Sequence, residues 1–134
     1  MRRSITTGSM TETCQQHVHK ACQIGADLIC AQGGEAGGHT GEIPSSILVP
    51  ACADVCRQYK SPLTGAPVRL VAAGGIFDGR GIAAALMMGA DAVWVGTRFV
   101  TARESAAPTL GKKAYVFSWL PLNATCSGLT HLPP

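Results

Sequence analysis

The residues best suited to chemistry lie in one glycine-rich stretch, residues 31–41, which reads Ala-Gln-Gly-Gly-Glu-Ala-Gly-Gly-His-Thr-Gly. Five of these eleven residues are glycine, and they surround a single imidazole, that of His39. Because histidine titrates near neutral pH, it can act as a base or as a hydrogen-bond donor. Glycine loses much conformational entropy on folding, so a cluster of it suits a backbone that approaches a ligand or takes a positive φ. We therefore predict that this loop presents backbone amides and one titratable side chain to a bound cofactor. The alternative is a flexible surface loop.

The other titratable and cationic side chains are weaker candidates for chemistry. Glu35 is able to serve as a second acid or base, but ordering of the loop or exposure to solvent is the simpler interpretation. His17 and His19 lie two residues apart on a predicted helix. They therefore point to different faces, and we expect both at the surface. Arg98 and Arg103 could hold an anion, but surface charges are the favoured interpretation.

Two further glycine turns follow apolar runs, at Gly74-Gly75 and at Gly96-Thr97. Successive backbone amides in such turns can form a nest for an anion, and Thr97 adds a hydroxyl donor. A helix that begins near Gly79 would add the positive end of its dipole. A tight turn alone would also explain Gly74-Gly75. Taken together, the three glycine-rich loops favour a bound phosphate group.

Three short apolar runs predict buried β-strands at residues 26–31, 68–73 and 92–95, and a glycine-rich loop follows each run. The runs are continuous rather than alternating, which is typical of strands that are covered on both faces. The Gly-Ala-Asp sequence at residues 25–27 is repeated at residues 89–91, before the third strand. Helix–glycine–strand units at this spacing predict parallel strands joined by crossover helices.

Three helices are predicted, one before each of these strands. The first follows a capping-box pattern at residues 9–12 and ends at Gly25, which suits a helix C-terminus. The second covers residues 50–59, because proline suits a first helical turn, and residues 42–49 before it are expected to be irregular. The third covers residues 79–88. Its predicted cap is Asp78, and its predicted core-facing apolar stripe is Ile82, Leu86 and Met87.

The fold predicted from these units is α/β, a partial TIM (β/α)8 barrel with parallel strands. In such a barrel, ligands bind at the C-terminal ends of the strands, and all three glycine-rich loops lie at such ends. A complete barrel takes about 250 residues, so we expect the 134 residues to hold the last three or four β/α units. A Rossmann fold is disfavoured, because residues 33–38 do not match its G-x-G-x-x-G pattern. An open sheet edge predicts self-association.

Composition restricts the classes of partner. The chain is 46% hydrophobic and 14% charged, and its formal net charge is +3. The basic residues are scattered and form no face interleaved with aromatic residues, so nucleic-acid binding is not expected. The most apolar stretch, residues 81–100, contains Asp91 and Arg98, and Gly89 and Gly96 interrupt it. We therefore expect a helix, a turn and a strand there, and no membrane span.

The six cysteines show no C-x-x-C motif and no Cys/His spacing of a zinc site, so no metal centre is predicted. Four of them lie in apolar patterns and are expected in the core: Cys14, Cys22, Cys30 and Cys52. This usage indicates a reducing compartment, and the cytoplasm is the predicted location. The short basic start of the chain, with serine and threonine, leaves an organelle presequence open.

Three motifs in this order resemble the nitronate monooxygenase family, formerly called 2-nitropropane dioxygenases. They are the loop at residues 31–41, the Ala-Ala-Gly-Gly-Ile and Asp-Gly-Arg-Gly segments within residues 72–81, and Val-Gly-Thr-Arg-Phe at residues 95–99. The similarity extends over residues 10–108. Members of the family are FMN-dependent (β/α)8 barrels that oxidise alkyl nitronates with dioxygen to carbonyl compounds and nitrite. The resemblance therefore implies a flavoprotein oxidoreductase, a monooxygenase that acts on a small nitronate or nitroalkane.

The resemblance also implies roles for individual residues. The histidine of the Gly-Gly-His motif, here His39, is the family's catalytic residue. It sits over the flavin and abstracts the α-proton of a neutral nitroalkane or holds its nitro group. The loop residues implied to contact FMN are Gln32, Gly37 and Gly38. The residues implied to hold the FMN phosphate are Gly74, Gly75, Trp94, Val95, Gly96 and Thr97.

The resemblance divides the chain into two parts. Residues 1–113 correspond to the C-terminal part of an FMN-binding barrel, and residues 114–134 form a divergent tail without an assigned function. The family's first strands do not appear in this sequence. Two alternatives stay open. One is a related FMN-dependent barrel oxidoreductase, such as an enoyl reductase, and the other is a truncated, non-catalytic piece of a barrel.

Overall fold

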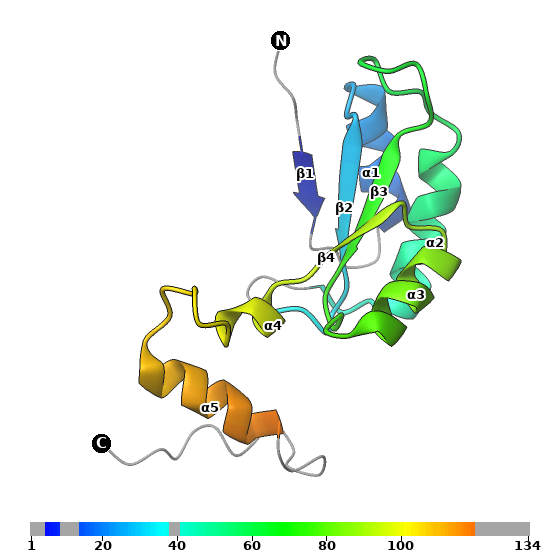
Figure 1. The fold of residues 1–134 in the computed structure, drawn as a ribbon. Coiled ribbons are helices and arrows are strands. Elements are labelled where there is room, and N and C mark those ends of the chain that lie inside the picture. Colours follow the sequence, from blue (N-terminus) through cyan, green and yellow to red (C-terminus); the bar gives the residue numbers. More distant parts are fainter. Residues whose placement is uncertain (1–4, 9–13, 38–40, 120–134) are drawn as a thin grey trace. The chain divides into compact units, whose positions relative to one another are not determined.

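A parallel β-sheet with helices on one side forms the first part of the chain in the computed structural model (Figure 1). The structure describes residues 5–8, 14–37 and 41–119. The predicted capping box at residues 9–12 therefore lies outside the described residues. The chain separates into two units, one ending at Gly96 and the other beginning at Thr97.

Four strands form the sheet in the order β1-β2-β3-β4, and every neighbouring pair is parallel. The predicted parallel arrangement is thus confirmed. β2 (Leu28–Gln32), β3 (Arg69–Ala73) and β4 (Ala92–Trp94) correspond to the three predicted strands. β1 (Ile5–Gly8) was not predicted. Its Ile-Thr-Thr-Gly sequence contains no apolar run, and the strand is defined by its pairing with β2.

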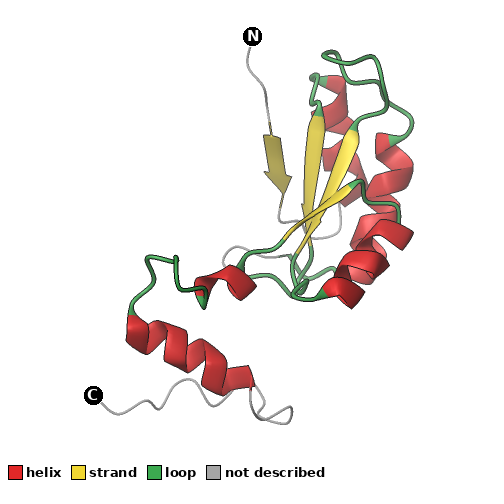
Figure 2. Cartoon of the chain, viewed as in Figure 1, coloured by secondary structure: helices red, strands yellow, loops and turns green. Residues whose placement is uncertain are grey.

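The crossover helices are α1 (Cys14–Gln23), α2 (Ser45–Cys56) and α3 (Gly79–Met87), and they lie on the same side of the sheet (Figure 2). One buried core joins these helices to the sheet. Burying a side chain of the size of leucine or valine stabilises a fold by about 1.5–3 kcal/mol. The strand members of this core are Ile29, Ala31, Leu70 and Ala72, and its larger helix members are Val18, Leu48, Val49, Cys52 and Val55.

Alternate residues of the strands point to the opposite face of the sheet. A second buried cluster lies there, made of Cys30, Val71 and Ala73. β2 and β3 are therefore buried on both faces, as their continuous apolar runs predicted. In β4 only Val93 packs against the core on the helix side, and Trp94 is exposed.

The cysteines of the first unit belong to its interior. Cys22, Cys30 and Cys52 are buried, as predicted, and so is Cys56. The side chain of Cys14 lies outside the described residues. Burial raises the pKa of the Cys56 thiol to about 12, and the neighbouring Cys22 adds to this effect. The Cys56 thiol is therefore protonated at neutral pH and acts as a small apolar residue.

The start of helix α2 corrects a predicted boundary. The predicted helix began at Pro50 after an irregular segment, whereas α2 begins at Ser45 and contains Pro50. A proline inside a helix lacks the amide that would bond to the carbonyl four residues back. The helix forms nonetheless because it buries apolar side chains on both sides of this proline. Leu48 and Val49 precede it, and both belong to the core.

The predicted core face of helix α3 is wrong. The three large apolar residues of the predicted stripe are exposed, at 37% for Ile82, 46% for Leu86 and 89% for Met87. Ala85 is the buried residue of this helix. α3 packs beside the edge strand β4, and its small residue allows a close approach to the core. Among the described residues of the first unit, no further strand lies beyond β4 to give the larger side chains a partner.

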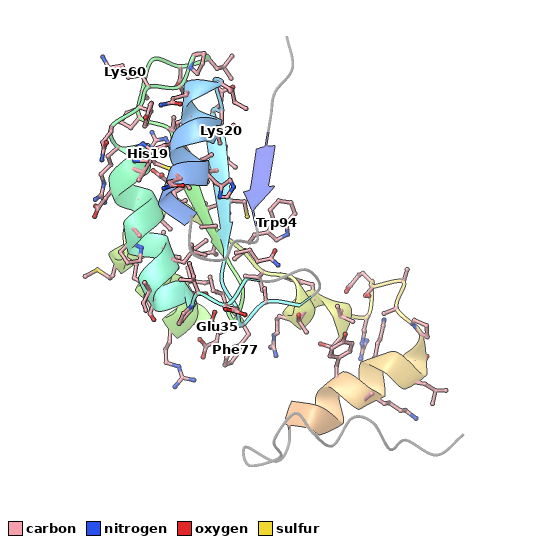
Figure 3. All side chains as sticks on the ribbon, turned by 180° about the vertical axis from the view of Figure 1, so that it is seen from behind. His19, Lys20, Glu35, Lys60, Phe77 and Trp94 are labelled. Atoms are coloured by element: carbon pink, nitrogen blue, oxygen red, sulfur yellow. The ribbon has the colours of Figure 1, made fainter. Side chains whose placement is uncertain are left out.

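His19 also departs from its predicted position. His17 is exposed, as expected, but His19 is half-buried between α1 and the turn after α2. Its Nδ1 lies 2.9 Å from the hydroxyl oxygen of Tyr59, and the two rings meet edge to face with centroids 5.6 Å apart. Figure 3 places His19 and Lys60 away from the end of the unit that carries Glu35. The contact links helix α1 to the turn after α2 and lies away from the predicted site.

Two helices lie in the described residues of the second unit, α4 (Thr97–Val100) and α5 (Thr109–Trp119). The Lys112 ammonium donates hydrogen bonds to the carbonyls of Ala102 at 2.7 Å and Ser105 at 2.8 Å, which ties the connecting loop to α5. α5 continues past residue 113, and the division of the chain at that residue stays a prediction. No helix among the described residues of either unit has the length and apolar character needed to cross a membrane.

Helices α1 and α3 end in the same hydrogen-bonded junction. After α1, the amide of Gly25 donates to Cys22 at 3.0 Å and that of Ala26 donates to Ala21 at 3.1 Å. After α3, the two amides at residues 89 and 90 donate to the carbonyls of residues 86 and 85, at 3.0 and 3.1 Å. This pair of bonds is the Schellman motif, which requires a residue with positive φ. The repeated Gly-Ala-Asp sequence thus builds a repeated turn.

Replacement of Gly89 tests this junction. Gly89 has a φ of +101°, and a Cβ there would lie 2.9 Å from the Cβ of Ala53 and 2.8 Å from Nη2 of Arg57. Gly65 is the matched control, because it also has a positive φ, +70°, but open space around the position of a Cβ. We expect Gly89→Ala to lower the free energy of unfolding by about 2–4 kcal/mol and Gly65→Ala by about 1 kcal/mol. Urea unfolding followed by circular dichroism measures both, and equal losses would contradict the packing argument.

Candidate functional site

The carboxyl ends of three parallel strands bring several predicted site residues to one edge of the sheet. Gln32 at the end of β2 is paired with Ala73 at the end of β3, and Ala73 is paired with Trp94 at the end of β4. The turn at Gly74-Gly75 follows directly, so it lies at this same edge (Figure 1). The glycine turns therefore gather at one end of the sheet, as a shared binding site requires.

The remaining predicted site residues differ in position. Gly37 is exposed, and its carbonyl lies 3.5 Å from Nε2 of Gln32, at the limit of a hydrogen bond. Val95 is half-buried and Gly96 is exposed, with open space around the position of a Cβ. Thr97 opens α4 in the second unit and is exposed. Two predicted residues, His39 and Gly38, lie outside the described residues.

The glycine-rich loop is anchored at its base by backbone hydrogen bonds. The amide of Gly33 donates to the carbonyl of Ala73, and that of Gly34 donates to the carbonyl of Ile43, both at 3.0 Å. There is no room for a side chain at Gly33, because a Cβ there would collide with Oγ of Ser45. The first residues of this loop therefore have a defined backbone, and a purely flexible loop is not what the structure shows for residues 33–37.

Glu35 binds the start of helix α2. Its two carboxylate oxygens each accept a hydrogen bond from the amide of Ser45 at 3.1 Å, and Oε2 also accepts one from the Ser45 hydroxyl at 2.8 Å. Burial raises the pKa of Glu35, but hydrogen bonds from its own amide and from Ser45 outweigh burial and hold the pKa below its ordinary value. The interpretation that Glu35 orders the loop is confirmed.

The turn after β3 packs directly on this loop. Gly74 and Gly75 have φ values of +95° and +69°, a region that favours glycine. A Cβ at Gly74 would lie 3.0 Å from the Cβ of Ala36, and one at Gly75 would lie 3.0 Å from the Cβ of Glu35. Loop packing alone thus explains both glycines. Within the described part of the chain, the amides of Gly74, Gly75 and Ile76 donate no hydrogen bond to a protein acceptor, so they are available to an anion.

The N-terminus of helix α3 is already occupied by a carboxylate. Asp78 caps it as predicted, and its Oδ1 accepts hydrogen bonds from the amides of Gly81 and Arg80, both at 3.0 Å. The Arg80 side chain also donates to Oδ2, from Nε at 2.9 Å and from Nη2 at 2.8 Å. The Gly81 amide and the Arg80 side chain lower the pKa of Asp78. Asp78 therefore offsets the dipole of α3, and the expected help from this helix to a phosphate is reduced.

Ser45 is the residue of this edge that sequence patterns missed. Its contact with Glu35 joins two residues ten positions apart. One signal could have found it, since Pro44 precedes Ser45 and proline is common at the start of a helix. Figure 3 shows Glu35 and Phe77 at the same end of the unit. Among the described residues, no group of three or more His, Cys, Asp or Glu side chains could hold a metal ion.

A family model for nitronate monooxygenase matches residues 2–121. This chain belongs to the nitronate monooxygenase family. It is 45% identical over 97 residues to the nitronate monooxygenase of Neurospora crassa, a match that covers 70% of this chain and 25% of that protein. The residues gathered at the sheet edge are therefore those of a family member, and the resemblance found in the three motifs is confirmed.

Two further comparisons define the range of relatives. The chain is 42% identical over 101 residues to the (3aS,4S,5R,7aS)-5-hydroxy-7a-methyl-1-oxo-octahydro-1H-indene-4-carboxyl-CoA dehydrogenase of Mycobacterium tuberculosis, over 75% of this chain and 26% of that protein. Among solved structures, the nitroalkane oxidase of Streptomyces ansochromogenes is similar, with a TM-score of 0.66 and 30% identity, over 84% of this chain and 31% of that chain. The chain spans about a quarter of the length of the two curated relatives.

The pH dependence of stability tests the bond between Glu35 and Ser45. A carboxylate with a lowered pKa stabilises the fold above its ordinary pKa of 4.5, and this contribution is lost as the pH falls through the lowered value. At pH ~7 we expect Glu35→Gln to unfold about 1 kcal/mol more easily than the wild type, and this difference to shrink toward zero by pH ~3. Urea unfolding across this range measures it. Glu42→Gln, which alters an exposed carboxylate just after the same loop, is the matched control for the loss of charge.

Proposed function

We propose that this chain is the C-terminal part of an FMN-dependent (β/α)8 barrel that oxidises alkyl nitronates and nitroalkanes with dioxygen to carbonyl compounds and nitrite. The observation that carries the proposal is the family match over residues 2–121. Names of relatives support the substrate class, since one is a nitronate monooxygenase and another a nitroalkane oxidase. Four parallel strands with crossover helices, in a chain a quarter as long as its relatives, support its place as the last units of a barrel.

The phosphate of FMN is the group that best suits the turn after β3. Three successive amides, at Gly74, Gly75 and Ile76, are available there, and two of them belong to residues without a side chain. We assign phosphate contacts also to residues 94–97 after β4, and ring contacts to Gln32 and to the Gly37-Gly38 pair. FMN would take electrons from the nitronate and pass them to dioxygen. The protein's part is to bind the cofactor and to orient the substrate beside it.

FMN uptake is the first test of this assignment. We expect the purified chain to bind added FMN, measured as quenching of flavin fluorescence and as flavin absorbance that stays with the protein after gel filtration. Release of nitrite from an alkyl nitronate in air would then establish the reaction. A chain that takes up no FMN would contradict the proposal and favour the truncated, non-catalytic alternative.

His39 is the residue to which we assign proton abstraction. The reaction of a neutral nitroalkane requires loss of an α-proton, and an imidazole with a pKa near neutrality can accept it. We expect His39→Ala to lower nitrite release from a neutral nitroalkane by roughly 100-fold or more. The preformed nitronate has already lost this proton, so its oxidation should fall less. FMN affinity should stay within about two-fold of the wild type.

A histidine outside the site provides the control for this test. His17→Ala changes an exposed residue of helix α1, and we expect wild-type rates from it. Wild-type turnover of neutral nitroalkanes by His39→Ala would remove His39 from the chemistry.

A second candidate function has one observation in its favour. The relative from Mycobacterium tuberculosis, 42% identical over 75% of this chain, is a dehydrogenase of a CoA thioester. A flavin-dependent reduction or oxidation of a thioester, such as that of an enoyl reductase, is therefore the alternative. Nitrite release from nitronates, compared with NAD(P)H-driven reduction of an enoyl thioester by the same FMN-loaded chain, distinguishes the two.

Assembly and location complete the proposal. β1 and β4 each have one neighbour in the described sheet, so each offers an unpaired edge. We propose self-association through these edges, which sedimentation over a range of protein concentrations would reveal as a rising average mass. Four buried cysteines that form no disulfide among the described residues, Cys22, Cys30, Cys52 and Cys56, are in keeping with the cytoplasm as the proposed location.

A further inference from the structure

We propose that Glu35 is a positioning residue that holds three segments of the candidate site together through its carboxylate and its methylene groups. The three segments are residues 33–37 of the glycine-rich loop, the first turn of helix α2, and the turn at Gly74-Gly75. The inference rests on the proposed function, because it assumes that this edge of the sheet receives FMN. It gives Glu35 a role in placing the groups that bind the cofactor, and no role in moving a proton.

Helix α2 lacks a cap of its own. The residue at its N-cap position is Pro44, which has no side-chain group to accept a hydrogen bond from the first turn. The first amides of a helix have no partner inside the helix. Glu35 supplies the missing acceptor from ten residues earlier, through the bonds to the Ser45 amide and hydroxyl. The carboxylate also places a negative charge at the positive end of the helix dipole.

The glycine-rich loop passes so close to the start of helix α2 that position 33 has no room for a side chain. A Cβ at Gly33 would collide with Oγ of Ser45 and would lie 2.6 Å from Oε2 of Glu35. A Cβ at Gly34 would lie 2.9 Å from the carbonyl oxygen of Gly41. The position of Gly33 therefore depends on the Glu35 carboxylate and on Ser45, while Gly34 packs against the far end of the loop.

The turn after β3 rests on the same side chain. A Cβ added at Gly75 would lie 3.0 Å from the Cβ of Glu35 and 3.7 Å from its Cγ, so the backbone of the turn packs against this side chain. A Cβ added at the neighbouring Gly74 would lie 3.1 Å from the carbonyl oxygen of Gly33. A movement of Glu35 would therefore shift the amides proposed for the phosphate together with the loop that carries Gln32 and Gly37. The Glu35 side chain, through its carboxylate on one side and its Cβ and Cγ on the other, thus connects the two parts of the proposed cofactor site.

Hydrogen exchange and FMN affinity together test this role. In Glu35→Gln, the side chain keeps one acceptor oxygen but loses the negative charge, so its hydrogen bonds with the amide and hydroxyl of Ser45 become weaker. We expect exchange at the amides of Gly33, Gly34 and Ser45 to become roughly 10-fold faster, and the Kd for FMN to rise roughly 10-fold. Glu42→Gln removes the same charge from an exposed position just after the same loop and should change each quantity less than about two-fold.

A double-mutant cycle with Ser45 shows whether the two residues act as a unit. Ser45→Ala removes the hydroxyl and keeps the amide, so we expect a smaller increase in Kd, about 3-fold. In the Glu35→Gln background the same change should raise the Kd by less than it does in the wild type, because the bond to the hydroxyl is already weakened. Additive effects of the two changes on the Kd for FMN would overturn the proposal that Glu35 and Ser45 act as a unit. Ser45→Ala also keeps the test decisive should Glu35→Gln not fold by circular dichroism.

The outcomes separate this inference from the proposed function. Faster exchange in Glu35→Gln with unchanged FMN affinity would overturn the positioning role, and so would equal behaviour of Glu35→Gln and Glu42→Gln. Absence of FMN binding by the wild-type chain would instead contradict the proposed function and with it the placing of a cofactor. The contact of Glu35 with the three segments would then be tested by the hydrogen-exchange rates alone.

Discussion

The register of the parallel strands is the constraint on which the rest of the first unit depends, and an aspartate sets it at the entry to β4. The backbone amide of Asp91 donates to the carbonyl of Leu70 at 2.8 Å, and the Asp91 carboxylate accepts the amide of Leu70 at 2.9 Å. Both backbone groups of one residue in β3 are thus bound by one residue before β4. Arg69 also donates to this carboxylate. Three residues later, the same register places Trp94 beside Ala73.

Asp27, the corresponding aspartate before β2, also fixes the start of a strand, but through hydrogen bonds with different partners. The carbonyl of Asp27 accepts the amide of Arg69 at 3.2 Å, and its side chain accepts hydrogen bonds from Ser61 and from the amide of Leu63. These contacts hold the loop before β3 against the start of β2. Because the strands are parallel, alignment at their amino ends determines which residues meet at their carboxyl ends. The position of the candidate site therefore follows from contacts at the opposite end of the sheet.

Local sequence was sufficient for the elements whose signals are local. The apolar run ending in Gly74-Gly75 predicted β3, and Asp78 predicted the cap of α3, because each signal lies within a few residues of its effect. The start of α2 was mispredicted because Pro50 was given more weight than the core positions of Leu48 and Val49, which become apparent only when the sheet is formed. β1 was missed for the same reason, since only its pairing with β2 defines it.

The candidate site, too, was predictable only where its signals lie close together in the sequence or follow from the direction of the strands. The edge of the sheet on which its residues lie follows from strand direction, so Gln32, the two glycine turns and Trp94 could be expected together. The contact between Glu35 and Ser45 could not, because it depends on the path of the chain between them and on where α2 begins. The exposed stripe of α3 was mispredicted because periodicity shows that a helix has an apolar face and does not show what covers that face.

The glycines of this edge carry less information about ligands than their number indicates. Gly33, Gly74 and Gly75 each lie where a Cβ would press on the neighbouring loop or helix, so protein packing alone requires them. What points to an anion is the set of donors that this packing leaves over. Once the turn takes positive φ at two successive residues, three amides in a row have no acceptor among the described residues. Gly74 and Ile76 are half-buried and Gly75 is exposed, so a phosphate bound at this turn would accept hydrogen bonds from amides whose positions packing has already fixed.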